Sequence, residues 1–195
     1  MDVCSDAGQG VGNGLYNITR GTWTSSTSFV LSKWQQTYEG VARTNYVIKS
    51  LGTATNVSET VKTQILGEAK FLRALYYFNL MIHFGGVPIY DETFDYENNY
   101  MDMVKPRNSI DEVRAFILKD LQEAIGVLPV KWDAANYGRA TKGAAYALEG
   151  KVYLYNNQYD LAAKDFEEIV LDPSNRGYGY KLYNNLPDLF LPKGD

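Results

Sequence analysis

A short pattern near the end of the chain constrains the fold more than any other feature of the sequence. One helix-forming stretch carries Gly150 between the aromatic residues Tyr146 and Tyr153, and the next stretch carries Ala162 and Phe166 at helical spacing. Glycine inside a helix is unfavourable on its own, so a close approach by another segment is the usual reason for it. The pattern therefore predicts two helices in close contact, with Gly150 and Ala162 at the seam and Phe166 beside them.

This order of residues is that of a tetratricopeptide repeat, in which pairs of helices stack side by side. The preceding segment matches the second helix of such a repeat more loosely, through Ile117, Leu121, Ala124 and Pro129. An ordinary helical bundle with chance matches is the alternative. We predict an all-α fold, a tetratricopeptide-like helical repeat with long inserted loops.

Caps and breakers give approximate bounds for the helices. The first is expected to stop at Gly52, Asn56 with Glu59 forms a capping box for the second, and Ser109 with Glu112 forms one for the third. The residues Thr141 and Pro173 mark the start of the fourth helix and the end of the fifth. The expected helices lie at about 29–51, 56–83, 109–128, 141–156 and 159–171.

The chain divides into three parts. Residues 1–28 are rich in Gly, Ser, Thr and Asn and form an N-terminal loop region, residues 29–171 form the helical body, and residues 172–195 form a tail. The tail ends in an apolar patch at 189–191 without an obvious cap, so we expect it to be truncated and the chain to be a fragment of a longer single domain. The first residues show no secretory signal.

Composition excludes several classes of function. A net charge of -4 disfavours a nucleic-acid partner, and a mean hydropathy of -0.31 without an apolar run of about 18 residues excludes a transmembrane helix. The single cysteine cannot form an internal disulfide, and the single histidine leaves little metal chemistry, so no cofactor is expected.

Catalytic patterns are equally scarce. The sequence contains no zinc-protease, nucleophile-elbow, phosphate-loop or paired-cysteine motif. His83 lies at a helix end, where an imidazole near the last carbonyls is ordinary. One loop gathers carboxylates that suggest a glycosidase pair or a calcium site, but we expect a solvated acidic loop; they are Asp91, Glu92, Asp95, Glu97 and Asp102.

Four segments in order carry a resemblance to a known family. They are Trp34-x3-Tyr38-x2-Val41-x-Arg43-x-Asn45, the run 68–78 leading into Phe84-Gly85-Gly86-Val87-Pro88, Pro106-Arg107-Asn108-Ser109-x2-Glu112-Val113, and Gly138-Arg139-Ala140-Thr141-Lys142-Gly143-Ala144-Ala145 followed by 151–155. Together they resemble the SusD/RagB family of starch- and glycan-binding outer-membrane lipoproteins.

The resemblance implies a non-catalytic, surface-exposed oligosaccharide-binding protein of a bacterial outer-membrane glycan uptake system. It also implies delivery of the glycan to a SusC-like TonB-dependent transporter. Members carry a lipid-bearing cysteine at the mature N-terminus, and because Cys4 follows no signal sequence, we do not assign that role to it. Membrane contact is therefore expected only through a lipid anchor absent from this chain.

The N-terminal loop region is the expected ligand site. Sugar rings stack on aromatic side chains, while their hydroxyls pair with planar polar groups. The loop holds this mixture within 18 residues, as Asp6, Asn13, Tyr16, Arg20 and Trp23. The alternative is that Trp23 and Tyr16 pack against the helices. Trp132 and Tyr137 form a second candidate.

Other expectations concern the helices and the rival functions. Glu68 lies in an apolar stretch and requires a partner, with Arg43 or Arg73 the first candidates. Tyrosines at helical spacing are expected to pack between helices, namely Tyr46, Tyr76, Tyr77, Tyr146 and Tyr153. A peptide-docking module would expose aromatics on the inner helix face rather than on the loops, and a glycan-cleaving enzyme would need two carboxylates flanking a cleft.

Overall fold

The computed structural model describes residues 20–96, 98, 104–173, 176–180 and 185 of the 195-residue chain. Within this part no strand is present, and the predicted all-α class is confirmed. The elements are α2 (Ser28–Thr53), α3 (Glu59–Phe84), α4 (Ile110–Val127), the 3₁₀ turn η3 (Ala134–Asn136), α5 (Lys142–Tyr155) and α6 (Tyr159–Val170).

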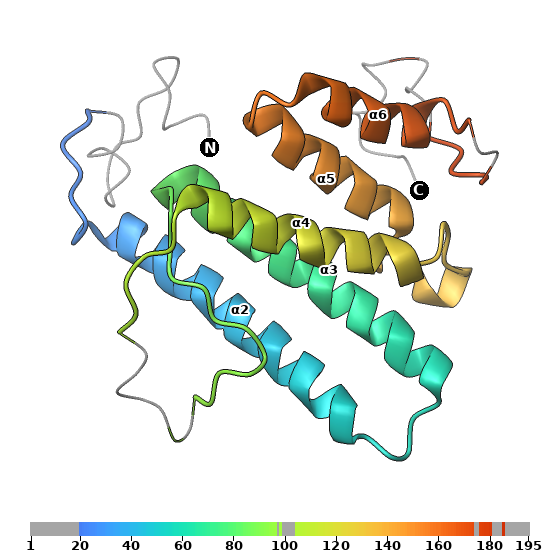
Figure 1. The fold of residues 1–195 in the computed structure, drawn as a ribbon, viewed down its shortest axis with the longest axis horizontal. Helices are drawn as coiled ribbons and strands as arrows, with labels where there is room; N and C mark the ends of the chain where they lie inside the picture. The colour runs from blue at the N-terminus through green and yellow to red at the C-terminus, as the bar shows by residue number, and fades with distance from the viewer. Residues whose placement is uncertain (1–19, 97, 99–103, 174–175, 181–184, 186–195) are drawn as a thin grey trace, which may run out of the picture.

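Each of these helices packs against the one that follows it in the sequence (Figure 1). Successive helices run in opposite directions, so the chain forms a row of hairpins from α2 to α6. The long connection between α3 and α4, residues 85–109, is called the insertion below. It leaves this row and crosses over α2 before α4 begins. The expected tetratricopeptide-like stacking with an inserted loop is therefore what the chain adopts.

The core lies between α2, α3, α4 and α5. Fully buried side chains come from all four helices, among them Val41, Leu80, Ile117 and Val152. Burying one such side chain contributes roughly 1.5–3 kcal/mol. Since α3 contributes to the core along most of its length, it is the central helix that the two-faced apolar pattern indicates.

Most helix ends follow their local signals. Ser109 and Glu112 form the reciprocal capping box, and the Thr141 hydroxyl accepts from the Ala144 amide. Two predicted ends were wrong. The first helix continues through Gly52 to Thr53, because that glycine does not take a left-handed conformation. The second begins at Glu59, because the Ser58 hydroxyl rather than Asn56 accepts from a first-turn amide.

The seam between α5 and α6 confirms the opening pattern. A Cβ placed on Gly150 would lie 2.7 Å from Cε1 of Phe166, so the glycine makes room for that ring. Ala162 is 2% exposed on the facing helix. Small residues therefore set the spacing of this pair, as the sequence predicts.

Replacing Gly150 with alanine is expected to lower the free energy of unfolding by about 1 kcal/mol, because displacing Phe166 costs more than the gain in helix propensity. The matched control is Gly126→Ala in α4, where an added Cβ meets nothing within 4 Å. That variant is expected to gain roughly 0.5–1 kcal/mol. Urea unfolding measures both, and equal effects of the two changes would contradict the seam.

Candidate functional site

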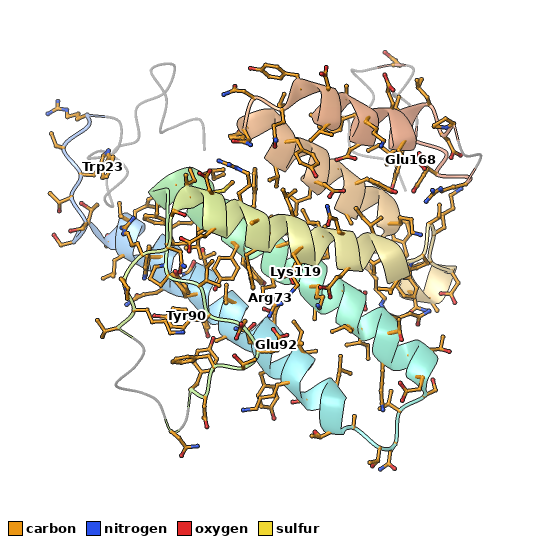
Figure 2. The ribbon with its side chains drawn as sticks, in the orientation of Figure 1. Trp23, Arg73, Tyr90, Glu92, Lys119 and Glu168 are labelled. Atoms are coloured by element: carbon orange, nitrogen blue, oxygen red, sulfur yellow. The ribbon has the colours of Figure 1, made fainter. Side chains whose placement is uncertain are left out.

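The expected ligand residues fall partly within the described chain. Asp6, Asn13 and Tyr16 lie outside the described residues. Arg20 and Trp23 are both exposed and precede α2 in the sequence, and Figure 2 shows Trp23 beside the start of that helix. A turn positions this segment, since the Thr24 amide donates to the Thr27 hydroxyl at 2.9 Å and the Thr27 amide donates back to the Thr24 carbonyl at 3.0 Å.

Trp23 lies at a pocket of about 590 Å³ where the start of α2 meets the end of α3. Its ring lines this pocket and is still 54% exposed, so Trp23 is not packed into the helical body. Aromatic and basic side chains form much of the wall, including Phe29, Trp34, His83, Phe84 and Arg107. A pocket of this size, with an exposed indole at its edge, is able to hold a small ring-shaped ligand.

The aromatic wall of the Trp23 pocket, formed by Trp34 and Phe84, is held by contacts with Arg107. Trp34 meets Phe84 edge to face at 5.0 Å between ring centroids, and the Arg107 guanidinium lies 5.7 Å from the Trp34 ring centroid. Nη1 of Arg107 donates to the carbonyls of Phe84 at 2.8 Å and Gly86 at 3.0 Å. The aromatic wall is therefore formed before any ligand arrives.

The two ends of the long α3–α4 insertion meet beside this pocket. Gly85 ends α3 with φ of 72°, and a Cβ on Gly86 would overlap the carbonyl oxygen of Asn108. The side-chain oxygen of Asn108 accepts from the backbone amide of Ile89 at 3.0 Å. The backbone amide of Asn108 donates to the Val87 carbonyl. This contact explains why the segment needs glycine there, and it fixes where the insertion leaves and rejoins the helices.

A buried arginine connects the insertion to three helices. Arg73 of α3 donates to both carboxylate oxygens of Asp120 on α4, at 2.7 and 2.8 Å, and to Asn45 of α2 at 2.8 Å. It also pairs with Glu92 of the insertion, and Figure 2 shows the two side chains together. Burial opposes its charge, but the hydrogen bonds and charges of Asp120 and Glu92 raise the pKa of Arg73.

Tyr90 is pinned in the same region. The Tyr77 hydroxyl accepts from the Tyr90 amide at 2.7 Å and donates to its carbonyl at 3.0 Å. Asn45 donates to that carbonyl at 2.9 Å and to the Tyr96 hydroxyl at 3.0 Å. Burial raises the pKa of Tyr77, so its hydroxyl stays protonated and able to donate. The insertion thus has a fixed path over α2.

The carboxylates of the insertion differ from the solvated loop expected for them. Glu92 pairs with buried Arg73, and the sequence did not predict this pairing. Burial acts to raise the pKa of Glu92, but the hydrogen bond and charge of Arg73 lower it overall. The Thr93 amide and hydroxyl donate to Asp91 and lower its pKa against the effect of burial. Glu97 and Asp102 lie outside the described residues.

His83 and the acidic side chains are the candidate metal ligands of the described part, and His83 makes a simple local contact. Nδ1 of His83 lies 2.7 Å from the Asn79 carbonyl one turn earlier, which is the ordinary role expected of it. Among the described residues, no three His, Cys, Asp or Glu side chains are grouped so that they would hold a metal ion. The described helices also include none that is long and apolar enough to cross a membrane.

Comparison with known proteins decides the family. The sequence pattern of the SusD-like proteins described as starch-binding and associating with the outer membrane matches residues 11–154. This chain belongs to the SusD-like family. The match includes Trp23, the whole insertion and the buried arginine network, so the geometry above is that of a SusD-like protein.

Relatives with solved structures share the helical body of this SusD-like chain. A laminarin-binding SusD-like protein has a TM-score of 0.80 and 32% identity over 90% of this chain and 37% of its own. Surface glycan-binding protein A from Bacteroides thetaiotaomicron, solved with laminarihexaose, has a TM-score of 0.75 and 26% identity over 91% of this chain and 35% of its own.

A SusD-like protein of Bacteroides ovatus is 33% identical over 174 residues, which are 83% of this chain and 30% of that relative. This SusD-like chain thus spans about a third of the length of the relatives that it matches. The family is one of glycan-binding proteins, and its described fold is the tetratricopeptide-like one predicted.

The second candidate pair in this SusD-like chain separates into two different roles. Nε1 of Trp132 donates to the Ala140 carbonyl at 2.6 Å, and the Arg139 guanidinium lies 4.1 Å from the Trp132 ring centroid. Arg139 also donates to both carboxylate oxygens of Glu68, so the expected partner of Glu68, Arg43 or Arg73, was wrong. Tyr137 is 93% exposed.

The tyrosines predicted to pack between helices do so with one exception. Tyr77 is buried, and Tyr76, Tyr146 and Tyr153 are half-buried. Tyr46 is 72% exposed, so the prediction was wrong for it. The helical spacing of Tyr46 predicted that it packs against another helix. The face of α2 that carries Tyr46 lies toward the insertion instead.

Proposed function

We propose that this protein is a non-catalytic glycan-binding component of a bacterial outer-membrane glycan uptake system. The observation that carries this proposal is Trp23, which is 54% exposed at the edge of an aromatic pocket. An indole held in this way offers a flat face to the C–H side of a sugar ring. Binding of this kind needs no covalent step and no metal.

Polar groups at the same pocket suit the hydroxyls of the sugar. Arg107, Lys33 and Ser25 line the pocket beside the rings, and the planar guanidinium of Arg107 is suited to neighbouring hydroxyls. Asp6, Asn13, Tyr16 and Arg20 complete the site in this proposal. Because the aromatic wall is already ordered, little conformational entropy is lost on binding.

The proposal includes the setting of the whole protein. Residues 1–28 serve as the ligand loop region, residues 29–171 as the scaffold and residues 172–195 as a connection to further chain. The longer protein stands at the cell surface on a lipid anchor and passes its glycan to a SusC-like TonB-dependent transporter. Membership of a family that associates with the outer membrane supports this arrangement.

The position of exposed aromatics bears on the rival docking module. Trp23 is 54% exposed in a loop rather than on the inner face of the helices, which is the position expected for sugar binding. The relatives that bind laminarin or laminarihexaose favour the same ligand class. A glycan is therefore the ligand we propose, and a peptide is not.

Trp23→Ala is expected to weaken glycan binding at least tenfold, since the stacking surface for one sugar ring is lost (about 1.4 kcal/mol or more). Isothermal titration calorimetry on the natural protein measures this, with a ligand selected on a glycan array. The matched control is Tyr137→Ala, an exposed aromatic in another loop, which leaves the affinity unchanged.

Unchanged affinity in the Trp23 variant would remove the pocket as the site and leave the family assignment intact. A loss confined to the Tyr137 variant would move the site to the loop before α5. Hydrolysis of any polysaccharide in the same panel would contradict the non-catalytic assignment.

A further inference from the structure

Three depressions lie end to end along α2. The Trp23 pocket, of about 590 Å³, is the first, and a groove of about 520 Å³ between α2 and the insertion is the second. A third, of about 430 Å³, lies near the end of α2. Trp34 lines the first and second, and Tyr96 lines the second and third, so the three adjoin.

One stripe of α2 lines all three depressions. Among the α2 residues that line them, one set recurs every three or four positions, as Leu31, Gln35, Tyr38, Ala42, Tyr46 and Lys49. Such spacing places side chains on one face of a helix. The face that packs into the body is a different one and includes Val41, Thr44 and Ile48. The stripe therefore runs for most of a 26-residue helix, which is about 39 Å long.

The insertion forms the wall of the groove that faces this stripe of α2, and several contacts hold that wall in place. The Tyr38 hydroxyl donates to the Pro88 carbonyl at 2.7 Å, which joins α2 to the start of the wall. Lys105 lies 5.1 Å from the Tyr90 ring centroid and 4.8 Å from that of Phe94. Together with the Asn45 bonds to Tyr90 and Tyr96, these contacts hold the aromatic rings of the wall in one arrangement.

The three depressions offer both aromatic rings and hydrogen-bonding groups. Trp34, Tyr38, Tyr96 and Tyr46 supply aromatic surface in order along the stripe. Gln35, next to Trp34, and Lys49, beyond Tyr46, are exposed and make no hydrogen bond or ion pair within the part of the chain that the structure covers. An extended sugar chain presents apolar ring faces and hydroxyls along its whole length, so both kinds of side chain on this surface find partners in it.

We propose that an extended oligosaccharide binds along α2, from the Trp23 pocket to Tyr46, as one continuous binding track. This inference rests on the proposed function for the class of ligand, but it goes further in stating that one site holds many sugar units. Units bound beyond the Trp23 pocket add contacts without a new loss of translational freedom, so affinity rises with chain length.

Calorimetry with maltooligosaccharides and laminarioligosaccharides of two and eight sugar units tests the track on the natural protein. For the series that binds, we expect the eight-unit chain to bind at least tenfold more tightly than the two-unit chain. Tyr46→Ala is expected to abolish most of that gain and to leave two-unit binding unchanged. Tyr46 is 72% exposed, so this variant is expected to fold.

The matched control is Tyr159→Ala on α6, which is 60% exposed and lies on none of the three depressions. Equal affinity for both lengths would overturn the track, and so would an eight-unit affinity that Tyr46→Ala does not change. The Trp23→Ala experiment tests the proposed function separately. Binding of neither series, or competition by an extended peptide instead of the eight-unit chain, overturns the track and its ligand class together.

Discussion

Arg73→Met is expected to lower the free energy of unfolding by about 3–5 kcal/mol. Arg73 is 2% exposed and holds Asp120, which is 1% exposed, through two hydrogen bonds. Methionine is close to arginine in length, so the main change is the loss of the positive charge and of its donors. Asp120 is then a buried carboxylate without its partner, and Glu92 and Asn45 lose the contact that joins the insertion to α2 and α3.

Two controls separate the buried network from charge in general. Arg43→Met removes an exposed pair with Glu39, and it is expected to cost less than about 0.5 kcal/mol. The double variant Arg73→Met with Asp120→Leu is expected to recover most of the lost stability, because the fully buried carboxylate is removed with its partner and only the half-buried Glu92 stays without Arg73. Urea unfolding gives all three values. An Arg73 variant no less stable than the Arg43 variant would contradict a structural role for the network.

Glu149→Gln is expected to stabilise the protein by about 2 kcal/mol at pH 8. Glu149 on α5 is 5% exposed and Asp165 on α6 is 9% exposed. Burial, and then the charge of Asp165, raises the pKa of Glu149 from 4.5 to about 7, and burial raises the pKa of Asp165 to about 6. The Asp165 Oδ2 atom is buried and makes no hydrogen bond within the described residues.

The direction of the pH dependence follows from these shifts. Between pH 4.5 and about 7 the folded state binds more protons at Glu149 than the unfolded state does, so stability falls as the pH rises. Below pH 4.5 the carboxyl group is neutral in both states, and the glutamine variant then has about the stability of the parent protein. Its advantage appears as the pH rises to 7 and remains above it.

Unfolding at pH 4 and pH 8 measures this difference, with Glu167→Gln as the control. Glu167 is exposed on α6, and its replacement is expected to change stability by less than about 0.5 kcal/mol at both values. A Glu149 variant that is less stable at pH 8, or that differs equally at both pH values, would show that the buried carboxylates carry no such penalty.

The binding surface was only partly predictable from the sequence. Trp23 was recognised because it lies outside any helical period in a polar loop, and the structure places it at a pocket. The track along α2 was not recognised. Tyr38 and Tyr46 have the same periodicity as core residues, and only the path of the insertion over α2 shows that one face of this helix lines a groove.

The sequence by itself determined the helical class, the order of the helices and the close seam at Gly150, because those depend on contacts within about four residues or on a side chain too small to keep its neighbour away. The tertiary structure alone decided the long-range polar partners. Glu68 pairs with Arg139, and Arg73 pairs with Asp120 and Glu92, because the fold brings these groups together across many intervening residues. A buried charge requires a partner, but only the path of the backbone determines which residue reaches it.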